Sequence, residues 1–121
     1  MVKALFDTNI LIDYLNAIPQ AKTELEQFNH KAISIITWME VMIGAEKSLA
    51  DETRSFLDGF DLIPLDDTVA EGAVRLRREY RIKLPDAIVW ASAQTNSMLL
   101  VTRNTKVFPA GDPSVRVPYK V

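Results

Sequence analysis

Apolar positions along the chain form two patterns, short continuous runs and segments in which they recur at helical spacing. Continuous runs are typical of buried strands, and the wider spacing is typical of amphipathic helices. The pattern predicts strands at residues 2–6, 32–36, 61–65 and 98–102, with a weak edge strand within 114–121. It predicts helices at residues 10–18, 20–28, 37–45, 51–60, 68–80 and 85–95. Strands and helices therefore alternate along the chain.

Capping motifs suggest where three of these helices begin. Thr37 with Glu40, and Thr68 with Glu71, have the spacing of a capping box, in which each side chain binds the other residue's backbone N–H. Pro85 suits the first helical position and favours an extended residue before it. The sequence thus predicts helix starts at Thr37, Thr68 and Pro85.

The alternation predicts an α/β fold with a mainly parallel central sheet of four to five strands and helices on both faces. A chain of 121 residues with 48% hydrophobic content fits one compact domain, and no repeat or Gly/Ser linker divides residues 1–121. Sheets of this kind place their functional sites at the carboxyl ends of the strands. Functional residues are therefore expected at those ends.

The overall charge narrows the choice of partners and location. With 14 basic and 16 acidic residues the formal net charge is −2, so any contact with nucleic acid must be local. Cysteine is absent, which excludes disulfides and thiolate metal sites. Charge enters the N-terminal segment too early for a signal peptide or a membrane span. We expect a cytoplasmic protein that does not enter the membrane.

Three acids, Asp7, Glu40 and Asp86, follow or flank apolar segments near strand-to-helix transitions. Each has a structural alternative: Asp7 suits a helix cap, Glu40 a capping box, and Asp86 the positive end of a helix dipole. Together, however, they can converge at one sheet edge, where carboxylates repel each other unless a cation offsets them. We expect all three to be catalytic residues that bind a metal ion.

The surrounding residue types favour a hard cation. Oxygen ligands without cysteine suit Mg²⁺ or Mn²⁺, and such ions stabilise charge during phosphodiester hydrolysis. Asp86 is our candidate for orienting or deprotonating the attacking water. Thr8, Asn9, Thr102 and Asn104 are candidates for supporting the site, because hydroxyl and amide groups bind metal-bound water or phosphate oxygens. Their alternative role is turn and cap chemistry.

A basic run, Arg75 to Lys83, leads toward Asp86 and can guide a phosphate backbone to the acids. Within this run Arg81 and Lys83 are candidates for RNA contact, together with Arg103. The alternative is a solvated helix face, which suits Arg75 best because Glu71 and Glu79 lie four residues away. The single histidine, at position 30 in a polar turn, is interpreted as a surface residue.

Four motifs in order resemble those of PIN domains and cover essentially the whole chain. They are Phe6-Asp7-Thr8-Asn9, Ser34 to Glu40 followed by Gly44, Leu84-Pro85-Asp86-Ala87, and Thr102-Arg103-Asn104. Among PIN domains the chain looks most like the small VapC-type toxins of type II toxin–antitoxin pairs. The resemblance implies Mg²⁺-dependent endoribonuclease activity, a cognate antitoxin, an RNA substrate and a homodimer. It also implies that Asp7, Glu40 and Asp86 bind metal, supported by Thr102 and Asn104.

The chain departs from the family pattern at Val107, where the family commonly has a further aspartate. Valine cannot coordinate a cation, so one alternative is a weakened protein that binds antitoxin or RNA without efficient cleavage. Asp112 is a potential substitute, although Pro109 and Pro113 predict a turn around it. A small-molecule phosphatase with Asp7 as nucleophile is a third alternative, but Asn9 stands where such enzymes generally have a second aspartate.

Overall fold

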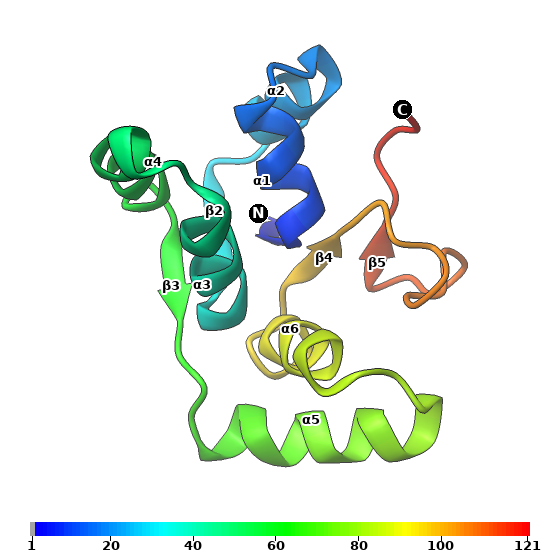
Figure 1. Ribbon diagram of the computed structural model, residues 1–121. Coiled ribbons are helices and arrows are strands. Elements are labelled where there is room, and N and C mark those ends of the chain that lie inside the picture. Colours follow the sequence, from blue (N-terminus) through cyan, green and yellow to red (C-terminus); the bar gives the residue numbers. More distant parts are fainter. Residues whose placement is uncertain (1) are drawn as a thin grey trace.

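The computed structural model describes residues 2–121, and this part of the chain folds into a parallel sheet covered by helices (Figure 1). The strands are β1 (Lys3–Phe6), β2 (His30–Ser34), β3 (Asp61–Ile63), β4 (Leu99–Val101) and β5 (Val115–Arg116). The helices are α1 (Thr8–Leu15), α2 (Pro19–Glu26), α3 (Ile35–Gly44), α4 (Ala50–Leu57), α5 (Asp67–Tyr80) and α6 (Leu84–Thr95). A short 3₁₀ helix, Lys47–Leu49, precedes α4.

The five strands form one sheet in the order β3-β2-β1-β4-β5, with every neighbouring pair parallel. The central strand β1 pairs with β2 on one side, where Leu5 faces Ala32, and with β4 on the other, where Leu5 faces Leu100. Short strands, β3 and β5, lie at the two edges. The predicted parallel sheet is therefore confirmed, including a short edge strand from the C-terminal segment.

Alternating side chains of β1 reach two separate cores, which explains why residues 4–6 of this strand are all apolar. Leu5 packs in the core on the α5 and α6 side, together with Trp90. Ala4 and Phe6 point to the opposite core, which residues of α1, α2, α3 and α4 complete, among them Leu11. Figure 1 shows α1 and α2 on the side of the sheet away from α5 and α6. Helices on both faces were predicted and are confirmed.

The predicted capping boxes are wrong. Helix α3 begins two residues before Thr37, and its N-cap is Ser34, whose hydroxyl accepts a hydrogen bond from the Ile36 backbone N–H. Thr37 instead lies buried inside the helix. Helix α5 is capped by Asp66, whose carboxylate accepts from the Val69 N–H, so Thr68 is already helical. In both helices a good capping residue upstream in the sequence takes the position.

The remaining differences concern element ends. Leu84 is helical rather than extended, because α6 begins there and Pro85 is its second residue. Strand β2 lies two residues earlier than predicted, since α3 takes Ile35. Strand β3 stops at Ile63, before Pro64, and the C-terminal strand covers only residues 115–116. Among the described residues, no helix is both long and apolar enough to span a bilayer.

Candidate active site

A cavity at the carboxyl ends of β1, β2 and β4 gathers the predicted acids. Asp7 follows β1 directly, Glu40 lies on α3 after β2, and Asp86 lies in the first turn of α6, which packs on β1, β2 and β4. The cavity is lined by Asp7, Thr8, Asn9, Ile12, Asp13, Glu40, Asp86, Arg103 and Asn104. The three acids chosen from the sequence therefore line one cavity, although Asp86 follows helix α5 and not a strand.

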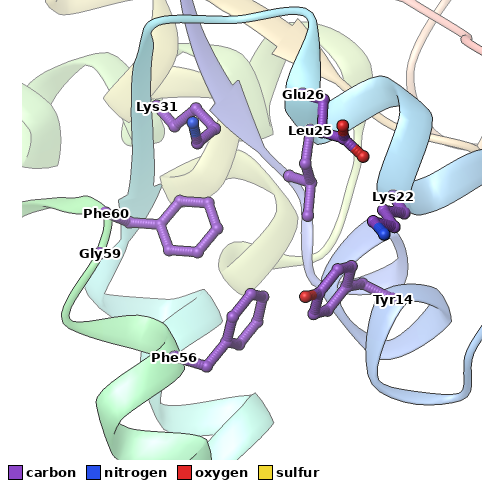
Figure 2. A pocket seen from close by; sticks show the side chains of 8 residues that line it. All are labelled: Tyr14, Lys22, Leu25, Glu26, Lys31, Phe56, Gly59 and Phe60. Carbon is purple, nitrogen blue, oxygen red and sulfur yellow. The ribbon is translucent and has the colours of Figure 1, made fainter.

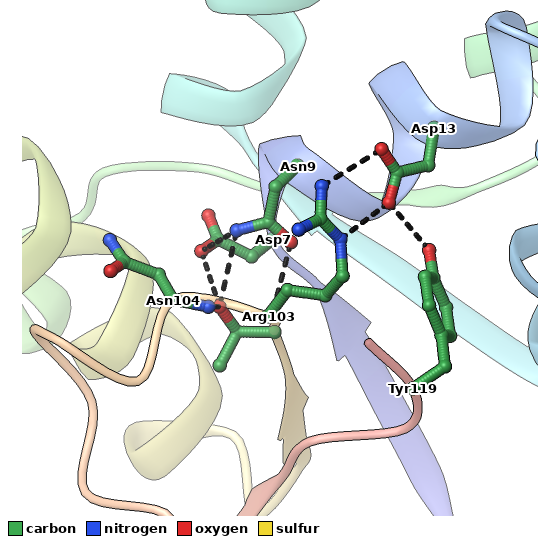
Figure 3. Close-up of polar contacts among 7 residues, drawn as sticks. Asp7, Asn9, Asp13, Arg103, Asn104 and Tyr119 are labelled. Carbon is green, nitrogen blue, oxygen red and sulfur yellow. Dashed lines mark hydrogen bonds and ion pairs between the residues drawn. The ribbon is translucent and has the colours of Figure 1, made fainter. Parts of the chain in front are cut away.

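Asp7 is the most constrained of these acids. Its Oδ1 accepts a hydrogen bond from the Thr8 backbone N–H at 2.8 Å, which makes it the N-cap of α1. Its Oδ2 accepts from the Thr102 hydroxyl at 2.8 Å and from Asn9 Nδ2 at 3.1 Å (Figure 3). A carboxylate has about four acceptor positions, so about one remains, on Oδ1. Asp7 therefore both caps α1 and lines the cavity.

Burial and neighbouring acids raise the pKa values of Asp7 and Asp86. Asp7 is only 6% exposed, and this burial raises its pKa from the ordinary 3.8 to about 6. The hydrogen bonds from Thr102 and Thr8 act in the opposite direction, while the charges of Asp86 and Glu40 raise the pKa further. The pKa of Asp86 is also raised, by burial and then by Glu40, although Lys83 lowers it. The carboxylates therefore affect one another electrostatically.

Thr8 links two of the acids. Its backbone N–H binds Asp7, and its hydroxyl donates to Glu40 Oε1 at 2.7 Å. The Thr37 hydroxyl, buried inside α3, lies 3.1 Å from the Thr8 hydroxyl. Glu40 is otherwise exposed to solvent, and it does not cap its own helix. The structural alternative offered for Glu40 by the capping-box motif is therefore removed.

The loop after β4 supports the other side of Asp7. The Thr102 hydroxyl donates to Asp7 and accepts from the Asn104 N–H at 3.0 Å. Asn9 bridges the two segments, because its Nδ2 contacts Asp7 and Thr102 while its Oδ1 accepts from the Arg103 N–H at 3.1 Å. Thr8, Asn9, Thr102 and Asn104 thus all contact one another or the acids.

Sequence reasoning missed one acid of this cavity, Asp13. This residue lies four positions after Asn9 on α1, and its buried carboxylate binds Arg103 through Nε at 2.6 Å and Nη2 at 2.9 Å. Tyr119, in the segment after β5, donates its hydroxyl to the same carboxylate at 2.8 Å (Figure 3). The spacing from Asn9 was the available signal, because residues four apart share a helix face.

The cavity carries more negative than positive charge. Its lining contains four carboxylates and Arg103, whose charge is already matched by Asp13. Over residues 2–121, no three Asp, Glu or His side chains stand in an arrangement that would ligate one ion directly. Asp7, Glu40 and Asp86 therefore line a common space without forming a direct three-carboxylate site, and their role as metal ligands stays a prediction.

The basic candidates do not converge on the acids as a group. Arg81 ends α5 in a left-handed conformation (φ 55°) and lines a separate hollow with Arg77 and Arg78. Lys83 acts on Asp86 only through its charge. Arg103 does line the acidic cavity, but Asp13 fixes it there. Within the described part of the chain, Arg103 is thus the one basic candidate that lines the acidic cavity.

Three further residues do not line the acidic cavity. His30 is the first, exposed residue of β2, as its interpretation as a surface residue requires. Val107 packs against the core beside α5 and α6. Asp112 binds the backbone N–H and hydroxyl of Ser114, at 2.8 and 2.6 Å, and these bonds lower its pKa. It belongs to its own turn and does not line the cavity, so it does not replace the missing acid.

A second, mainly apolar pocket opens on another part of the surface. It is lined by Tyr14, Lys22, Leu25, Glu26, Lys31, Phe56, Gly59 and Phe60, from α1, α2, β2 and the end of α4 (Figure 2). Tyr14 and Phe56 stack with ring centroids 4.7 Å apart. Lys22 and Lys31 stand at its margin (Figure 2). The pocket contains none of the acids described above.

Comparison with known proteins gives a consistent result. Residues 4–111 match the family model described as PIN domain. The tRNA(fMet)-specific endonuclease VapC of Shigella flexneri is 32% identical, over 89% of this chain and 91% of that protein. A toxin–antitoxin complex from Klebsiella pneumoniae contains a chain 50% identical, with TM-score 0.93, covering 98% of this chain and 100% of that one. A DNA-bound VapBC structure from Salmonella typhimurium is 25% identical, with TM-score 0.74 and 96% of each chain covered.

Proposed function

Because the chain belongs to the PIN domain family, we propose that it is a metal-dependent endoribonuclease and the toxin of a type II toxin–antitoxin pair. The VapC relative, an endonuclease by name, supports the activity, and the similar chain in a toxin–antitoxin complex supports the biological setting. The observation that carries the proposal is the shared cavity of Asp7, Glu40 and Asp86 at the carboxyl end of the sheet.

The donor set fits Mg²⁺. This ion usually keeps several waters and is held by one or two carboxylates, so it does not need three direct ligands. The unused acceptor position of Asp7 and the exposed Glu40 carboxylate supply hard oxygen ligands, and Asp86 adds negative charge. Mn²⁺ suits the same ligands. When bound, the cation supplies charge stabilisation to the phosphoryl oxygens during in-line displacement.

The three carboxylates differ in how they are held, which suggests a different role for each. Asp7 is oriented by three hydrogen bonds, and Glu40 is oriented by Thr8. Asp86 carries no hydrogen bond from the described side chains and has a raised pKa, so it is the carboxylate available to orient or deprotonate the attacking water. The hydrogen bond from Thr102 favours the charged form of Asp7.

An antitoxin is the proposed protein partner, with RNA as substrate. The apolar pocket of Figure 2, separate from the acidic cavity, provides aromatic surface of the kind enriched in protein interfaces. A homodimer belongs to the same proposal.

The test is cleavage of labelled total RNA by purified, antitoxin-free protein with Mg²⁺, Mn²⁺ or EDTA. We expect cleavage with either metal and none in EDTA. Asp7→Asn, Glu40→Gln and Asp86→Asn should each lower the rate by at least about 100-fold, the scale expected when acid–base or metal-holding groups are lost. Full activity in all three variants, or equal cleavage in EDTA, would refute the proposal.

A weakened protein that binds without efficient cleavage is the second candidate, and the position of Val107 favours it. This side chain packs against the core, so the segment after Asn104 contributes no carboxylate to the cavity. Under this alternative the parent protein binds RNA or antitoxin but does not cleave RNA with Mg²⁺ or with Mn²⁺. The Val107→Asp variant then gains RNA cleavage. Metal-dependent cleavage by the parent would instead establish that the acids present suffice.

A further inference from the structure

Arg103 is fixed from two positions on α1. Its backbone N–H donates to Asn9 Oδ1 at 3.1 Å, and its guanidinium forms a two-point pair with Asp13 at 2.6 and 2.9 Å. Asn9 and Asp13 are four residues apart, so both face the loop after β4. This arrangement fixes both the backbone and the head group of Arg103 relative to Asp7, which Asn9 also contacts.

The Asp13 carboxylate is committed to this pairing. Its Oδ1 accepts from Arg103 Nη2, and its Oδ2 accepts from Arg103 Nε and from the Tyr119 hydroxyl. Asp13 is buried at 7% exposure, whereas the Arg103 side chain is 27% exposed. An acid saturated in this way has little capacity left for a cation, although it lines the same cavity as Asp7.

Arg103 keeps donors for another ligand. Guanidinium has five N–H donors in a planar fork. Asp13 uses one on Nε and one on Nη2, which leaves both hydrogens of Nη1 and one of Nη2. The Tyr119 ring lies 6.0 Å from the guanidinium carbon, on the flank of the pair. A planar cation with free donors, held at an acidic cavity, suits a phosphate oxygen.

From this geometry we infer that Arg103 binds a phosphate of the RNA backbone at the acidic cavity, and that Asp13 and Tyr119 are positioning residues that hold it there. The inference rests on the proposed function and deepens it. It assigns the segment after β5 a part in the site, because Tyr119 reaches Asp13 from that segment. It also explains a buried acid at the cavity that is matched by a cation instead of adding to the negative charge.

The chain offers a matched control for this network. Arg116 on β5 forms a second two-point pair, with the buried Glu24 of α2, at 2.5 and 2.9 Å. This pair also links the C-terminal segment to an N-terminal helix, but it does not line the acidic cavity. Glu24→Gln therefore reports the structural loss alone, and Asp13→Asn reports structural loss plus misplacement of Arg103.

Two measurements separate the roles. The first is binding of a short labelled single-stranded RNA in EDTA, by fluorescence anisotropy at several NaCl concentrations, so that no cleavage occurs. Arg103→Gln should reduce the slope of log affinity against log salt by about 0.7, the value for one phosphate contact on a single strand. Tyr119→Phe changes no charge, so it should keep the slope and weaken binding by about threefold to tenfold. Asp13→Asn removes one negative charge, as Glu24→Gln does, so it should bind about threefold to tenfold more weakly than that control.

The second measurement is kcat/KM for cleavage with Mg²⁺, beside the thermal midpoint of each variant. We expect a loss of at least about tenfold in Arg103→Gln, and of about threefold to tenfold in Asp13→Asn and Tyr119→Phe, each worth a hydrogen bond or two. Glu24→Gln should lower the midpoint while leaving kcat/KM unchanged. Tyr119→Phe keeps the ring and removes one hydroxyl, so it provides a folded variant if Asp13→Asn does not fold.

The outcomes distinguish this inference from the proposed function. An unchanged salt slope in Arg103→Gln would overturn the phosphate contact. Losses in Asp13→Asn and Tyr119→Phe no larger than in Glu24→Gln would overturn the positioning role. If the parent cleaves no RNA, the proposed function fails, but the binding measurement in EDTA still decides whether Arg103 meets a phosphate and whether Asp13 holds it.

Discussion

Replacing Asp7 by asparagine should make the stability of the metal-free protein less dependent on pH. The folded protein holds the Asp7 proton up to a pKa of about 6, whereas the unfolded chain releases it near the ordinary value of 3.8. The folded state therefore binds more protons between these values, and the free energy of unfolding of the parent falls as the pH rises through this window. The asparagine side chain of the variant has no such proton to lose.

The size of the effect follows from the two pKa values. The pKa of Asp7 differs by about two units between the folded and the unfolded state. This difference corresponds to about 3 kcal/mol, at about 1.4 kcal/mol for each unit. The substituted amide also introduces a cost of its own, because its nitrogen would face the Nδ2 donor of Asn9 where Oδ2 of Asp7 now accepts. That cost does not vary with pH. The diagnostic quantity is therefore the change with pH in the stability difference between variant and parent.

The assay is urea unfolding of both proteins in EDTA at pH values between 4 and 7. Relative to the parent, Asp7→Asn should gain about 2 kcal/mol of unfolding free energy between the two ends of this range, because the unfolded chain is already partly ionised at pH 4. All other titrating groups are shared by the two proteins, so their contributions largely cancel. A stability difference that stays constant from pH 4 to pH 7 would refute the reasoning that Asp7 carries a strongly raised pKa.

Three other predictions concern the metal and the helix caps. Mg²⁺ at about ten times its Kd should stabilise the parent by about 1.4 kcal/mol at pH 7, measured by urea unfolding, and should not stabilise Asp7→Asn; equal stabilisation of both would place the ion elsewhere. Mg²⁺ affinity, measured by calorimetry, should fall about tenfold for each pH unit below 6 as Asp7 gains its proton; a constant affinity from pH 5 to pH 7 would contradict this. Asp66→Ala should cost about 1 kcal/mol in thermal unfolding, whereas Thr68→Ala should cost less than about 0.5, because Asp66 caps α5; the reverse order would contradict the cap.

The sheet could be predicted because its central strands are largely buried on both faces. Residues 4–6 and 99–101 form continuous apolar runs, which is typical of buried strands. The helices between the strands predict that the strands pair in parallel. Helix starts were less predictable. Ser34 and Asp66 are capping residues as good as Thr37 and Thr68, and the choice between them depends on where the preceding strand or loop ends in three dimensions.

The candidate site also contains residues that could be predicted from the sequence and residues that could not. Asp7, Glu40 and Asp86 could be chosen because each is polar at the junction of apolar segments, and the fold brings them to one cavity. Asp13 could not be chosen with equal ease, since its partners Arg103 and Tyr119 are 90 and 106 residues away along the chain. Only the parallel pairing of β4 with β1, and of β5 with β4, brings those residues to α1.

The energetics of Asp7 differ from those of a residue that only caps a helix. A carboxylate that only caps a helix sits near solvent, and its hydrogen bonds lower its pKa. Asp7 accepts three hydrogen bonds, yet burial and two neighbouring acids raise its pKa to about 6. Asparagine also caps helices well and would avoid this cost. A negative charge kept beside Glu40 and Asp86 at this cost agrees with the proposed metal site, where a bound cation would offset it.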